Sequence, residues 1–284
     1  MKRIGVVVNR PKDKGYACTA RVVERLVACG FDACLEADIC EAVGMGVAVS
    51  EATLYADSDF LICLGGDGTF LKTARHTLGS SKPVLGINLG SVGFLAEVEV
   101  ENIETAIDKL AAGEVRVQPR MVLRADVMRD GNLVYTEYAI NDAVVTRMAL
   151  SRIVDLHVSV DGQYLDVFPS DGLIVSTPTG STAYTLSAGG PIVQPEIPLM
   201  VITPICPHIL YSRSFIVSTD SRLSIRIGDG RTADAMLTAD GQEGFALELN
   251  DVVEISRAPE HILFASVERV NFFEVLRAKI HGRR

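Results

Sequence analysis

An apolar run that ends abruptly in glycines constrains the fold of this chain more than any other feature of its sequence. Residues 61–64 are apolar, and residues 65–68 read Gly-Gly-Asp-Gly. This pattern predicts a buried strand of a parallel sheet that ends in a tight turn. Apolar residues then return at intervals of four, at Phe70, Ala74 and Leu78, which predicts a helix after the turn.

The aspartate of this turn, Asp67, is therefore expected at the carboxyl end of a strand and the amino end of a helix. In an open α/β sheet, ligands bind at this position. Glycines let backbone N–H groups approach a phosphate closely, and the helix end adds partial positive charge. Because a carboxylate competes with an anion there, Asp67 indicates a chemical role. The alternative is a simple strand-to-helix turn with an aspartate cap.

The charge and composition exclude several classes of protein. A net charge of −9 and a pI near 5.1 argue against a surface for nucleic acid or for an acidic membrane. An acidic protein that binds a polyphosphate needs Mg²⁺ or local Lys and Arg side chains to offset repulsion. We see no secretion signal and no apolar stretch of membrane-spanning length, so we expect a cytoplasmic protein. The six cysteines form no CxxC pair and match no zinc pattern, and we expect no metal site built from protein side chains alone.

Strand-sized apolar runs alternate with helical spacing in the first part of the chain. We expect strands at residues 4–8, 31–35, 60–64 and 84–87, and helices at residues 20–28 and 103–110. Residues 88–93 form a second glycine-rich turn, after the last of these strands. The alternation predicts a parallel sheet with helices on its faces.

After about residue 115 the pattern changes to consecutive strand-sized runs. Asp-Gly pairs at 130, 161 and 240 lie between alternating runs and predict hairpin turns. A final helical stretch at residues 270–280 is expected to pack back on the first domain. We therefore predict an α/β plus β fold: an N-terminal α/β (Rossmann-like) domain joined to a C-terminal antiparallel β-rich domain of the β-sandwich type. The predicted domains comprise residues 1–115 with the returning helix in 268–284, and residues 116–267.

A hydroxyl-rich segment at residues 176–191 is small in its side chains and nearly uncharged. Such a loop can donate O–H and N–H groups to a ligand in close backbone contact. Within it, Ser181 is expected to cap a short helix and Tyr184 to offer a ring face to a base. The alternative is a long surface loop.

Further candidates lie at strand ends. Asn141 and Asp142 follow a strand, and an amide beside a carboxylate can bind ribose hydroxyls or a base edge, although a strand-end turn explains them equally well. Asp171 precedes a buried strand and is not needed to turn a hairpin. Lys72, Arg147 and Arg152 are candidates to neutralise ligand charge, and solvated side chains are the alternative for each.

Several common motifs do not occur in the sequence. It contains no GxxxxGK[ST] and no HRD…DFG set, which excludes P-loop kinases and protein kinases. The first strand is not followed by GxGxxG, which argues against an ordinary Rossmann dehydrogenase, and the chain contains no GxSxG elbow.

Taken together, three motifs resemble those of the NAD kinases. They are Gly65-Gly66-Asp67-Gly68-Thr69, then Asn141-Asp142, and then the segment 171–184, in this order and spacing. Lipid kinases and phosphofructokinases have similar glycine turns, whereas the stretch 177–184 is much more specific. The resemblance covers the whole chain. It implies an α/β domain followed by a β-rich domain, NAD held between them and across a subunit contact, and a homodimer or homotetramer.

The resemblance also implies roles for individual residues. Asp67 would be the catalytic carboxylate, Arg152 and Asp171 would contact the dinucleotide, and Gln242 would close the site. The remaining expected binding residues are Gly65, Gly66, Gly68 and Lys72 around the turn, Asn141 and Asp142 at a nucleoside portion, and Thr182, Ala183, Tyr184, Thr185, Leu186 and Ser187 in the hydroxyl loop. Many members carry Glu where this chain has Asp142.

The implied reaction is attack of the 2′-hydroxyl of the adenosine ribose of NAD on the γ-phosphate of ATP, or on another triphosphate or polyphosphate. Mg²⁺ would be carried on the donor phosphates. An aspartate is a weak base for a sugar hydroxyl, but in a loose transition state orientation matters as much as basicity. Two alternatives stay open, a lipid kinase of the diacylglycerol or sphingosine type and a dinucleotide sensor without catalysis. The donor, a preference for NAD or NADH, and feedback by NADP(H) are also open.

Overall fold

The computed structural model describes residues 2–90, 93–148, 153–209, 213–228, 235–267 and 271–281. The chain forms two compact units. Unit 1 comprises Met1–Pro119 with Ile262–Arg284, and unit 2 comprises Arg120–His261. The boundaries predicted from the sequence, after residues 115 and 267, lie a few residues from these.

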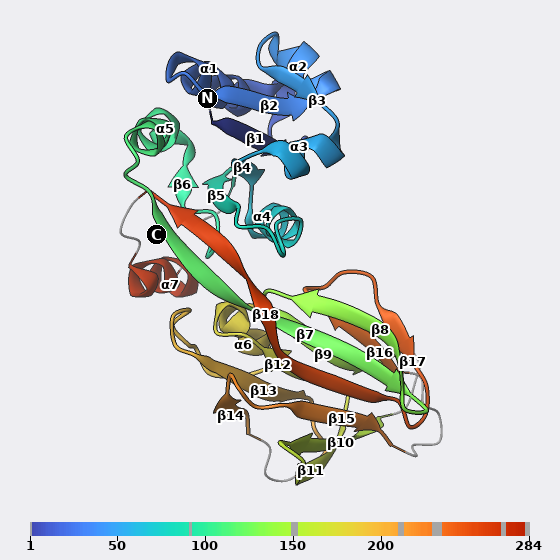
Figure 1. The fold of residues 1–284 in the computed structure, drawn as a ribbon. Coiled ribbons are helices and arrows are strands. Elements are labelled where there is room, and N and C mark those ends of the chain that lie inside the picture. The colour runs from blue at the N-terminus through green and yellow to red at the C-terminus, as the bar shows by residue number, and fades with distance from the viewer. Residues whose placement is uncertain are drawn as a thin grey trace. The chain divides into compact units, whose positions relative to one another are not determined.

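Unit 1 alternates strands and helices (Figure 1). Its strands are β1 (Arg3–Val8), β2 (Asp32–Glu36), β3 (Val47–Val49), β4 (Phe60–Gly65), β5 (Pro83–Asn88) and β6 (Val98–Glu99). Its helices are α1 (Ala17–Ala28), α2 (Ala37–Val43), α3 (Glu51–Asp57), α4 (Asp67–Arg75), α5 (Ile103–Ala111) and α7 (Phe272–His281), with short 3₁₀ turns at Lys14–Tyr16 and Val100–Asn102. The predicted final helix is thus present as α7 and belongs to unit 1, as expected.

The sheet of unit 1 is parallel and doubly wound. Its order is β5-β4-β1-β2-β3, and the last residues of β18 (Val252–Ser266) pair with β5 in parallel at the edge. From β1 the chain builds outward through β2 and β3, and then returns to place β4 on the other side of β1. The strand order therefore reverses between β1 and β4, and ligands bind at the carboxyl ends of the strands at such a point.

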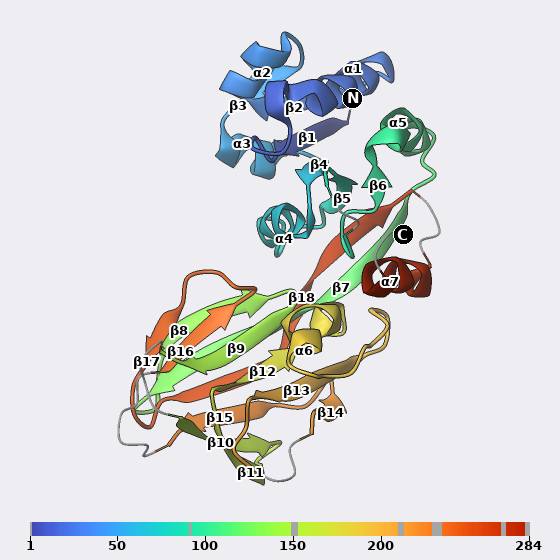
Figure 2. The same cartoon turned by 180° about the vertical axis from the view of Figure 1, so that it is seen from behind.

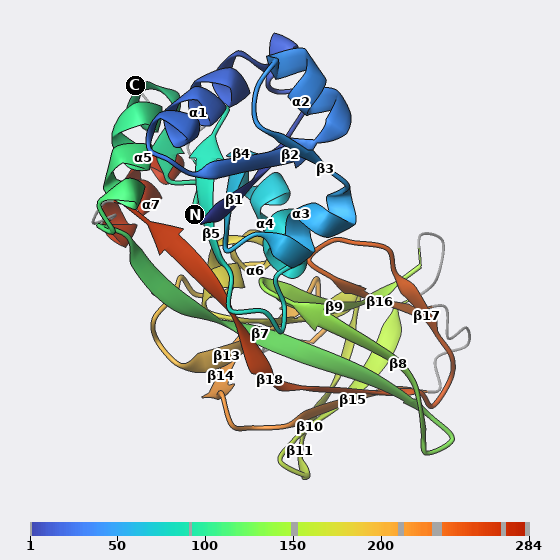
Figure 3. The same ribbon diagram turned by 45° about the horizontal axis from the view of Figure 1, so that its top comes forward.

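Helices cover both faces of this sheet. On one face, α1 and α5 lie side by side (Figure 3), and Val22 and Leu26 of α1 share a core with Ile103 and Ile107 of α5. On the other face, α3 packs against β1 so closely that a Cβ at Gly5 would lie 2.6 Å from Ser58 Oγ. Helix α4 also contacts β4 and β5.

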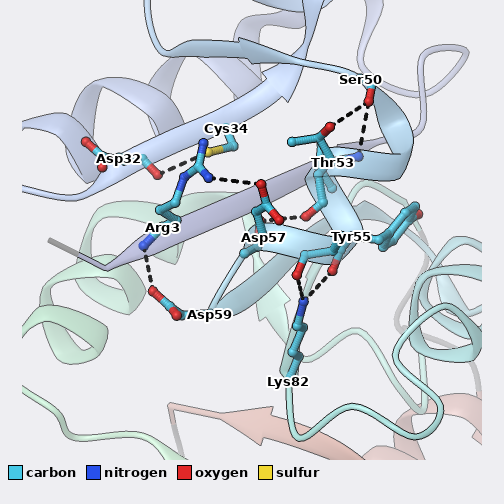
Figure 4. A network of polar contacts seen from close by, with 12 residues as sticks. Arg3, Asp32, Cys34, Ser50, Thr53, Tyr55, Asp57, Asp59 and Lys82 are labelled. Atoms are coloured by element: carbon cyan, nitrogen blue, oxygen red, sulfur yellow. Dashed lines mark hydrogen bonds and ion pairs between the residues drawn. The ribbon is translucent and has the colours of Figure 1, made fainter.

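A polar network links the start of β1 to the end of α3 and to the segments just before β4 and β5 (Figure 4). The Arg3 backbone N–H donates to Asp59 Oδ2 at 2.9 Å, and its guanidinium pairs with Asp57 at 3.3 Å. Lys82 donates to the carbonyl oxygens of Tyr55, at 2.6 Å, and of Ala56. These carbonyls belong to the last turn of α3, where no intrahelical donor remains, so this network is structural.

Unit 2 is built from two sheets, one ordered β11-β10-β15-β18-β7-β8 and the other β14-β13-β12-β9-β16-β17. The strands of the first sheet are β7 (Arg116–Arg129), β8 (Asn132–Ala139), β10 (Val154–Val160), β11 (Gln163–Ser170), β15 (Leu223–Ile227) and β18. Those of the second are β9 (Asp142–Arg147), β12 (Gly172–Ser176), β13 (Leu199–Ile205), β14 (Phe215–Ser218), β16 (Ala235–Ala239) and β17 (Phe245–Leu247). Pairing in the second sheet is antiparallel throughout.

Side chains from both sheets form a single core. Leu123 of β7 and Ile255 of β18 belong to the same buried cluster as Val145 of β9 and Leu173 of β12. The predicted fold class, an α/β domain with an antiparallel β-sandwich, is confirmed. The hairpins at 130 and 161 are also confirmed, since Arg129 pairs with Asn132 and Val160 with Gln163 across two-residue turns.

The long strands were underestimated. Two strands are longer than the strand-sized runs predicted after residue 115, since β7 spans Arg116–Arg129 and β18 spans Val252–Ser266. A proline has no N–H to donate to a ladder, and β18 contains Pro259. Pro259, however, lies between the stretch that pairs with β15 (252–255) and the stretch that pairs with β5 (263–265), so its missing N–H breaks no ladder on that side.

Candidate functional site

The glycine turn after β4 lies at the reversal point of the unit 1 sheet, next to the end of β1. The Asn9 backbone N–H donates to the Leu64 carbonyl at 2.9 Å, and the Asn9 side chain donates to Thr69 Oγ1 at 2.7 Å. A Cβ at Gly65 would clash with Thr69, so this glycine is required for the turn to close. The predicted strand, turn and helix are all present, and α4 begins at Asp67 itself.

The Asp67 carboxylate bridges the two glycine-rich turns. Oδ2 accepts the Phe94 N–H at 3.0 Å, and Oδ1 accepts the N–H groups of Leu95 at 3.0 Å and Ala96 at 3.4 Å. A Cβ at Gly93 would clash with Oδ1, so only glycine allows this approach. Asp67 is therefore not the cap of its own helix. Its side chain, 31% exposed, is held in one orientation by peptide groups of another loop.

Two lysines far away in the sequence lie at this turn. Lys279 of α7 places Nζ 4.0 Å from Asp67 Oδ2 and 5.3 Å from the centre of the Phe94 ring. Lys12 lies over the glycines, since a Cβ at Gly66 would be 2.8 Å from its Nζ and one at Gly90 would be 3.6 Å away. The turn thus carries positive charge from the first loop and the last helix of the chain.

Lys72, expected at the same turn, lies on a different side of α4. Five residues separate it from Asp67, which turns its side chain by about 140° around the helix. Burial lowers the pKa of His76, and the positive charge of Lys72 adds to this shift. Since His76 stacks on Tyr55 with ring centres 4.2 Å apart, Lys72 is near that ring pair. Gly68, by contrast, has no heavy atom within 4 Å of where a Cβ would lie, among the described residues.

In unit 2, Asn141 and Asp142 lie where three neighbouring strands meet: Asp142 begins β9, opposite Ser176 at the end of β12, and Ala239 ends β16. The Asn141 carbonyl accepts the Thr177 N–H at 2.9 Å and the Ser176 hydroxyl at 3.3 Å. In the described part of the chain, the contacts of Asn141 are made by its backbone, so its side-chain amide remains available to a ligand.

Asp142 is 5% exposed and carries the largest resolved perturbation of the candidate residues. Its pKa is raised to about 7, chiefly by burial and also by the Asp240 carboxylate, while a hydrogen bond from the Tyr184 backbone N–H opposes both effects. The hairpin predicted at Asp240 is present between β16 and β17, but the Asp240 side chain also bonds back toward Asn141.

The hydroxyl-rich segment forms a 3₁₀ turn, Thr179–Thr182, and a short helix α6 (Tyr184–Ser187), which contacts β12 (Figure 2). Ser181 does not cap this helix. Its hydroxyl donates to the Pro178 carbonyl at 2.7 Å and accepts the Val193 N–H at 3.0 Å, so this prediction was wrong. The hydroxyls of Ser176, Thr177, Ser181 and Thr182, which suggested ligand donors, donate to backbone carbonyls instead.

The other residues of this segment divide by exposure. The Thr182 hydroxyl donates to the Thr179 carbonyl at 3.3 Å, while Thr185 is buried and its hydroxyl has no hydrogen-bond partner among the described residues. Tyr184 is 43% exposed and, with Ser187, lines an open hollow of about 780 Å³ between α6 and β13. The exposed ring therefore remains a candidate stacking face, flanked by Ala183 and Leu186, which are partly exposed.

The structure does not bring Asp171 to the Asn141 cluster. Asp171 pairs with Arg147 through a 2.6 Å contact at the other end of β9 and β12. Five residues of β9 separate the two ends, which is roughly 17 Å. Gln242 lies in the same loop as Asp240 and donates to its carbonyl at 3.4 Å. Arg152 lies outside the described residues.

Three residues of these clusters were missed by sequence reasoning: Lys12, Lys279 and Asp240. Asp240 was interpreted only as a hairpin aspartate, and neither lysine was singled out. A weak signal existed for Asp240 alone, because it immediately precedes the expected binding residue Gln242.

The described residues contain no group of three or more His, Cys, Asp or Glu side chains that could hold a metal ion. In the same part of the chain, no helix has the length and apolar character needed to cross a membrane.

An open parallel sheet with a carboxylate-bearing glycine turn at its reversal point defines a nucleotide-binding α/β protein. Comparison with known proteins makes this specific. Residues 4–115 match the ATP-NAD kinase N-terminal domain, and residues 140–267 match the ATP-NAD kinase C-terminal domain. The chain belongs to the NAD kinase family.

Relatives support this assignment over the full length. The chain is 41% identical to the NAD kinase of Acetivibrio thermocellus, covering 100% of this chain and 98% of the relative. It is 42% identical to that of Ruminiclostridium cellulolyticum, covering 100% and 99%. Among solved structures, the NAD kinase from Archaeoglobus fulgidus in complex with ATP has a TM-score of 0.76 at 26% identity, covering 99% and 100%. Yeast NADH kinase complexed with NADH shares the fold, with a TM-score of 0.90 at 23% identity, covering 100% and 88%.

Proposed function

We propose that this chain phosphorylates the 2′-hydroxyl of the adenosine ribose of NAD to give NADP, with ATP as the donor. The observation that carries the proposal is the Asp67 carboxylate, held by three peptide N–H groups at the reversal point of the sheet in a chain that matches both NAD kinase domains. ATP as donor is supported by the Archaeoglobus fulgidus relative, whose structure is described in complex with ATP.

Asp67 has hydrogen-bonding capacity left for a substrate hydroxyl. A carboxylate offers about four lone-pair directions. Oδ1 accepts two N–H groups, whereas Oδ2 accepts only that of Phe94 among the described peptide groups. We assign the remaining direction of Oδ2 to the 2′-hydroxyl, which Asp67 would orient toward the donor phosphate and relieve of its proton late in transfer.

Positive charge at the turn suits the phosphates of the donor. The N–H groups at the start of α4, Lys12 over Gly66 and Gly90, and Lys279 beside Asp67 offset the acidity of a chain with net charge −9. Mg²⁺ would enter as a complex with the donor phosphates and shield the remaining charge. The binding role expected for Lys72 stays a prediction.

The acceptor residues in this proposal are those of unit 2: Asn141 and Asp142 bind hydroxyls or a base edge of NAD, and Tyr184 stacks on a ring. Asp171 lies roughly 17 Å along β9 from Asn141, and the resemblance to the NAD kinases implies that NAD is held across a subunit contact. We therefore propose a homodimer or homotetramer, which size-exclusion chromatography with light scattering would identify.

The test is a coupled assay for NADP⁺ formation from NAD⁺, ATP and Mg²⁺, with polyphosphate as a second donor and NADH as a second acceptor. Formation of NADP⁺, with no phosphorylation of diacylglycerol or sphingosine, is the expected result. Lipid phosphorylation without NADP⁺ would favour the lipid kinase instead. Binding of NAD without turnover would identify a dinucleotide sensor.

A further inference from the structure

The Asp240 carboxylate is directed at the start of β9 rather than into solvent. Oδ2 accepts the Ile140 N–H at 2.9 Å, and Oδ1 accepts the N–H groups of Asn141 at 2.7 Å and Asp142 at 3.2 Å. In return, the Asp240 backbone N–H donates to the Asp142 carbonyl at 3.0 Å. One side chain thus holds three successive peptide groups that lie about a hundred residues earlier in the chain.

The hairpin itself does not require this arrangement. Asp130, Asp161 and Asp240 all begin Asp-Gly turns with left-handed φ values of 49°, 52° and 51°. The Asp161 carboxylate accepts the Arg222 N–H at 2.8 Å, outside the cluster around Asn141. Because Asn adopts the left-handed conformation as readily as Asp, an amide would serve the turn at 240 equally well.

The opposite side of the same peptides is held as well. Thr177 donates its N–H to the Asn141 carbonyl and its hydroxyl to the Ile140 carbonyl, at 2.9 and 2.6 Å. A Cβ at Gly180 would clash with the Asn141 backbone. The backbone of residues 140–142 is therefore held between the hydroxyl-rich segment on one side and Asp240 on the other. The Asn141 side chain remains available to bind a ligand.

Taken alone, this arrangement of the two carboxyl groups costs electrostatic free energy. The Asp240 carboxylate lies close enough to the buried Asp142 to disfavour its charged form, and like charges at a buried site destabilise a fold. An Asn at position 240 would avoid that repulsion and keep the turn. The presence of the carboxylate therefore points to a function that needs both of its oxygens as acceptors.

We propose that Asp240 is a positioning residue of the NAD site: its carboxylate fixes the peptides of residues 140–142 and, through them, the directions in which Asn141 and Asp142 meet the dinucleotide. The inference rests on the proposed function, because it takes Asn141 and Asp142 as acceptor residues. Asp240 acts through the backbone and does not itself need to touch NAD.

The proximity of the two side chains also predicts an electrostatic effect of Asp240 on the ionisation of Asp142. Two groups face its carboxyl: the Asp240 carboxylate from the loop after β16, and the Tyr184 backbone N–H from α6. Replacing Asp240 with a neutral residue removes the like charge, so ionisation of Asp142 should move to lower pH.

The test compares Asp240→Asn, which keeps one acceptor oxygen, with Asp240→Gly, which keeps the left-handed turn and removes both. Asp161→Gly is the matched control, because Asp161 also begins an Asp-Gly turn of unit 2 with a left-handed φ. We measure kcat, the KM for NAD and for ATP, binding of NAD by calorimetry, melting temperature, and the pH dependence of NAD binding.

The expected result is a rise of roughly 10-fold or more in the KM and Kd for NAD in Asp240→Gly, a smaller rise in Asp240→Asn, and an unchanged KM for ATP. The pH at which the affinity for NAD changes should be lower in both variants than in the parent. Asp161→Gly should lower the melting temperature and leave the KM for NAD as in the parent.

Two outcomes would overturn the inference. One is a parental KM for NAD in Asp240→Gly; the other is an equal rise in the KM for NAD and the KM for ATP, which identifies a general structural role. If the parent chain itself makes no NADP⁺, the proposed function fails first, and the calorimetric comparison still decides whether Asp240 supports binding of NAD.

Discussion

The two units use the same arrangement at their candidate sites, with opposite electrostatics. In each, one aspartate binds three successive peptide N–H groups of a distant loop: Asp67 those of residues 94–96, and Asp240 those of residues 140–142. Asp67, however, is 31% exposed and has Lys279 beside it, whereas Asp240 faces the buried Asp142 carboxyl. The same hydrogen-bonding pattern can therefore serve two different roles. Exposure and a neighbouring positive charge allow Asp67 to act on a substrate, whereas the surroundings of Asp240 suit a residue that positions others.

The largest effect should come from Asp67→Asn. The amide keeps the size of the side chain and can still accept some of the peptide N–H groups, but it cannot take a proton from the 2′-hydroxyl. We expect kcat to fall by roughly 10²–10⁴-fold, with the KM for NAD changed only a few-fold. Steady-state assays of the folded variant provide the measurement.

A matched control is Asp13→Asn. Asp13 is 4% exposed, and its carboxylate accepts the N–H groups of Cys18 and Thr19 at the start of α1. This variant should lower the melting temperature and leave kcat as in the parent. Parental kcat in Asp67→Asn would show that Asp67, like Asp13, only holds peptide groups in place. The contrast between Asp67 and Asp240 would then disappear.

The second effect concerns pH and the stability of unit 2. The folded pKa of Asp142 is raised to about 7, chiefly by burial, so between its ordinary value of 3.8 and pH 7 the folded chain holds a proton that the unfolded chain has lost. Protonation therefore favours folding, and this contribution is lost as pH rises through 7. The free energy of unfolding should fall by roughly 3–5 kcal/mol between pH 4 and 8.

The measurement is urea unfolding of the parent and of Asp142→Asn across this pH range. The variant has no carboxyl to titrate, so its stability should lack the parent's decline toward neutral pH. Parallel curves for the two proteins would mean that the Asp142 carboxyl is ionised across this pH range. Its surroundings would then not raise its pKa, and the electrostatic contrast between the two units would fail.

A third effect tests whether unit 2 holds the acceptor. In Asn141→Ala and Tyr184→Ala, the KM for NAD should rise much more than the KM for ATP, because each loses a hydrogen bond or a stacking face. The expected cost is about 1–3 kcal/mol, or roughly 5- to 150-fold. Tyr164→Ala is the control for Tyr184, since that ring is 67% exposed on the β10–β11 hairpin. A rise confined to the KM for ATP would mean that unit 2 binds ATP, so the assignment of the two nucleotide sites would be reversed.

The smallest effect is expected at Lys12, which places charge over the glycine turn of unit 1. Lys12→Met should raise the KM for ATP by roughly 3- to 10-fold, as expected for one partly solvated charge, and less so at high salt. Lys14→Met removes an exposed lysine two residues away and should have no such effect. Equal behaviour of the two variants would remove Lys12 from the donor site.

Sequence reasoning succeeded where the signal was local. The strand, the glycine turn and the helix around Asp67, the hairpins at 130 and 161, and the change from β/α units to consecutive strands all follow from periodicity and turn chemistry. It failed at Ser181, whose hydroxyl bonds across to Val193 instead of capping α6, because a neighbouring loop offered a better partner than the helix end.

The sequence by itself determined the fold class, the family and the aspartate at the strand-to-helix turn, because these depend on residue order over a few positions. Only the tertiary structure decided what surrounds each carboxylate. Lys279 reaches Asp67 from the far end of the chain, and Asp240 reaches residues 140–142 across about a hundred positions. A side chain's charge is written in the sequence, but its electrostatic effect depends on distance and burial, and folding sets both.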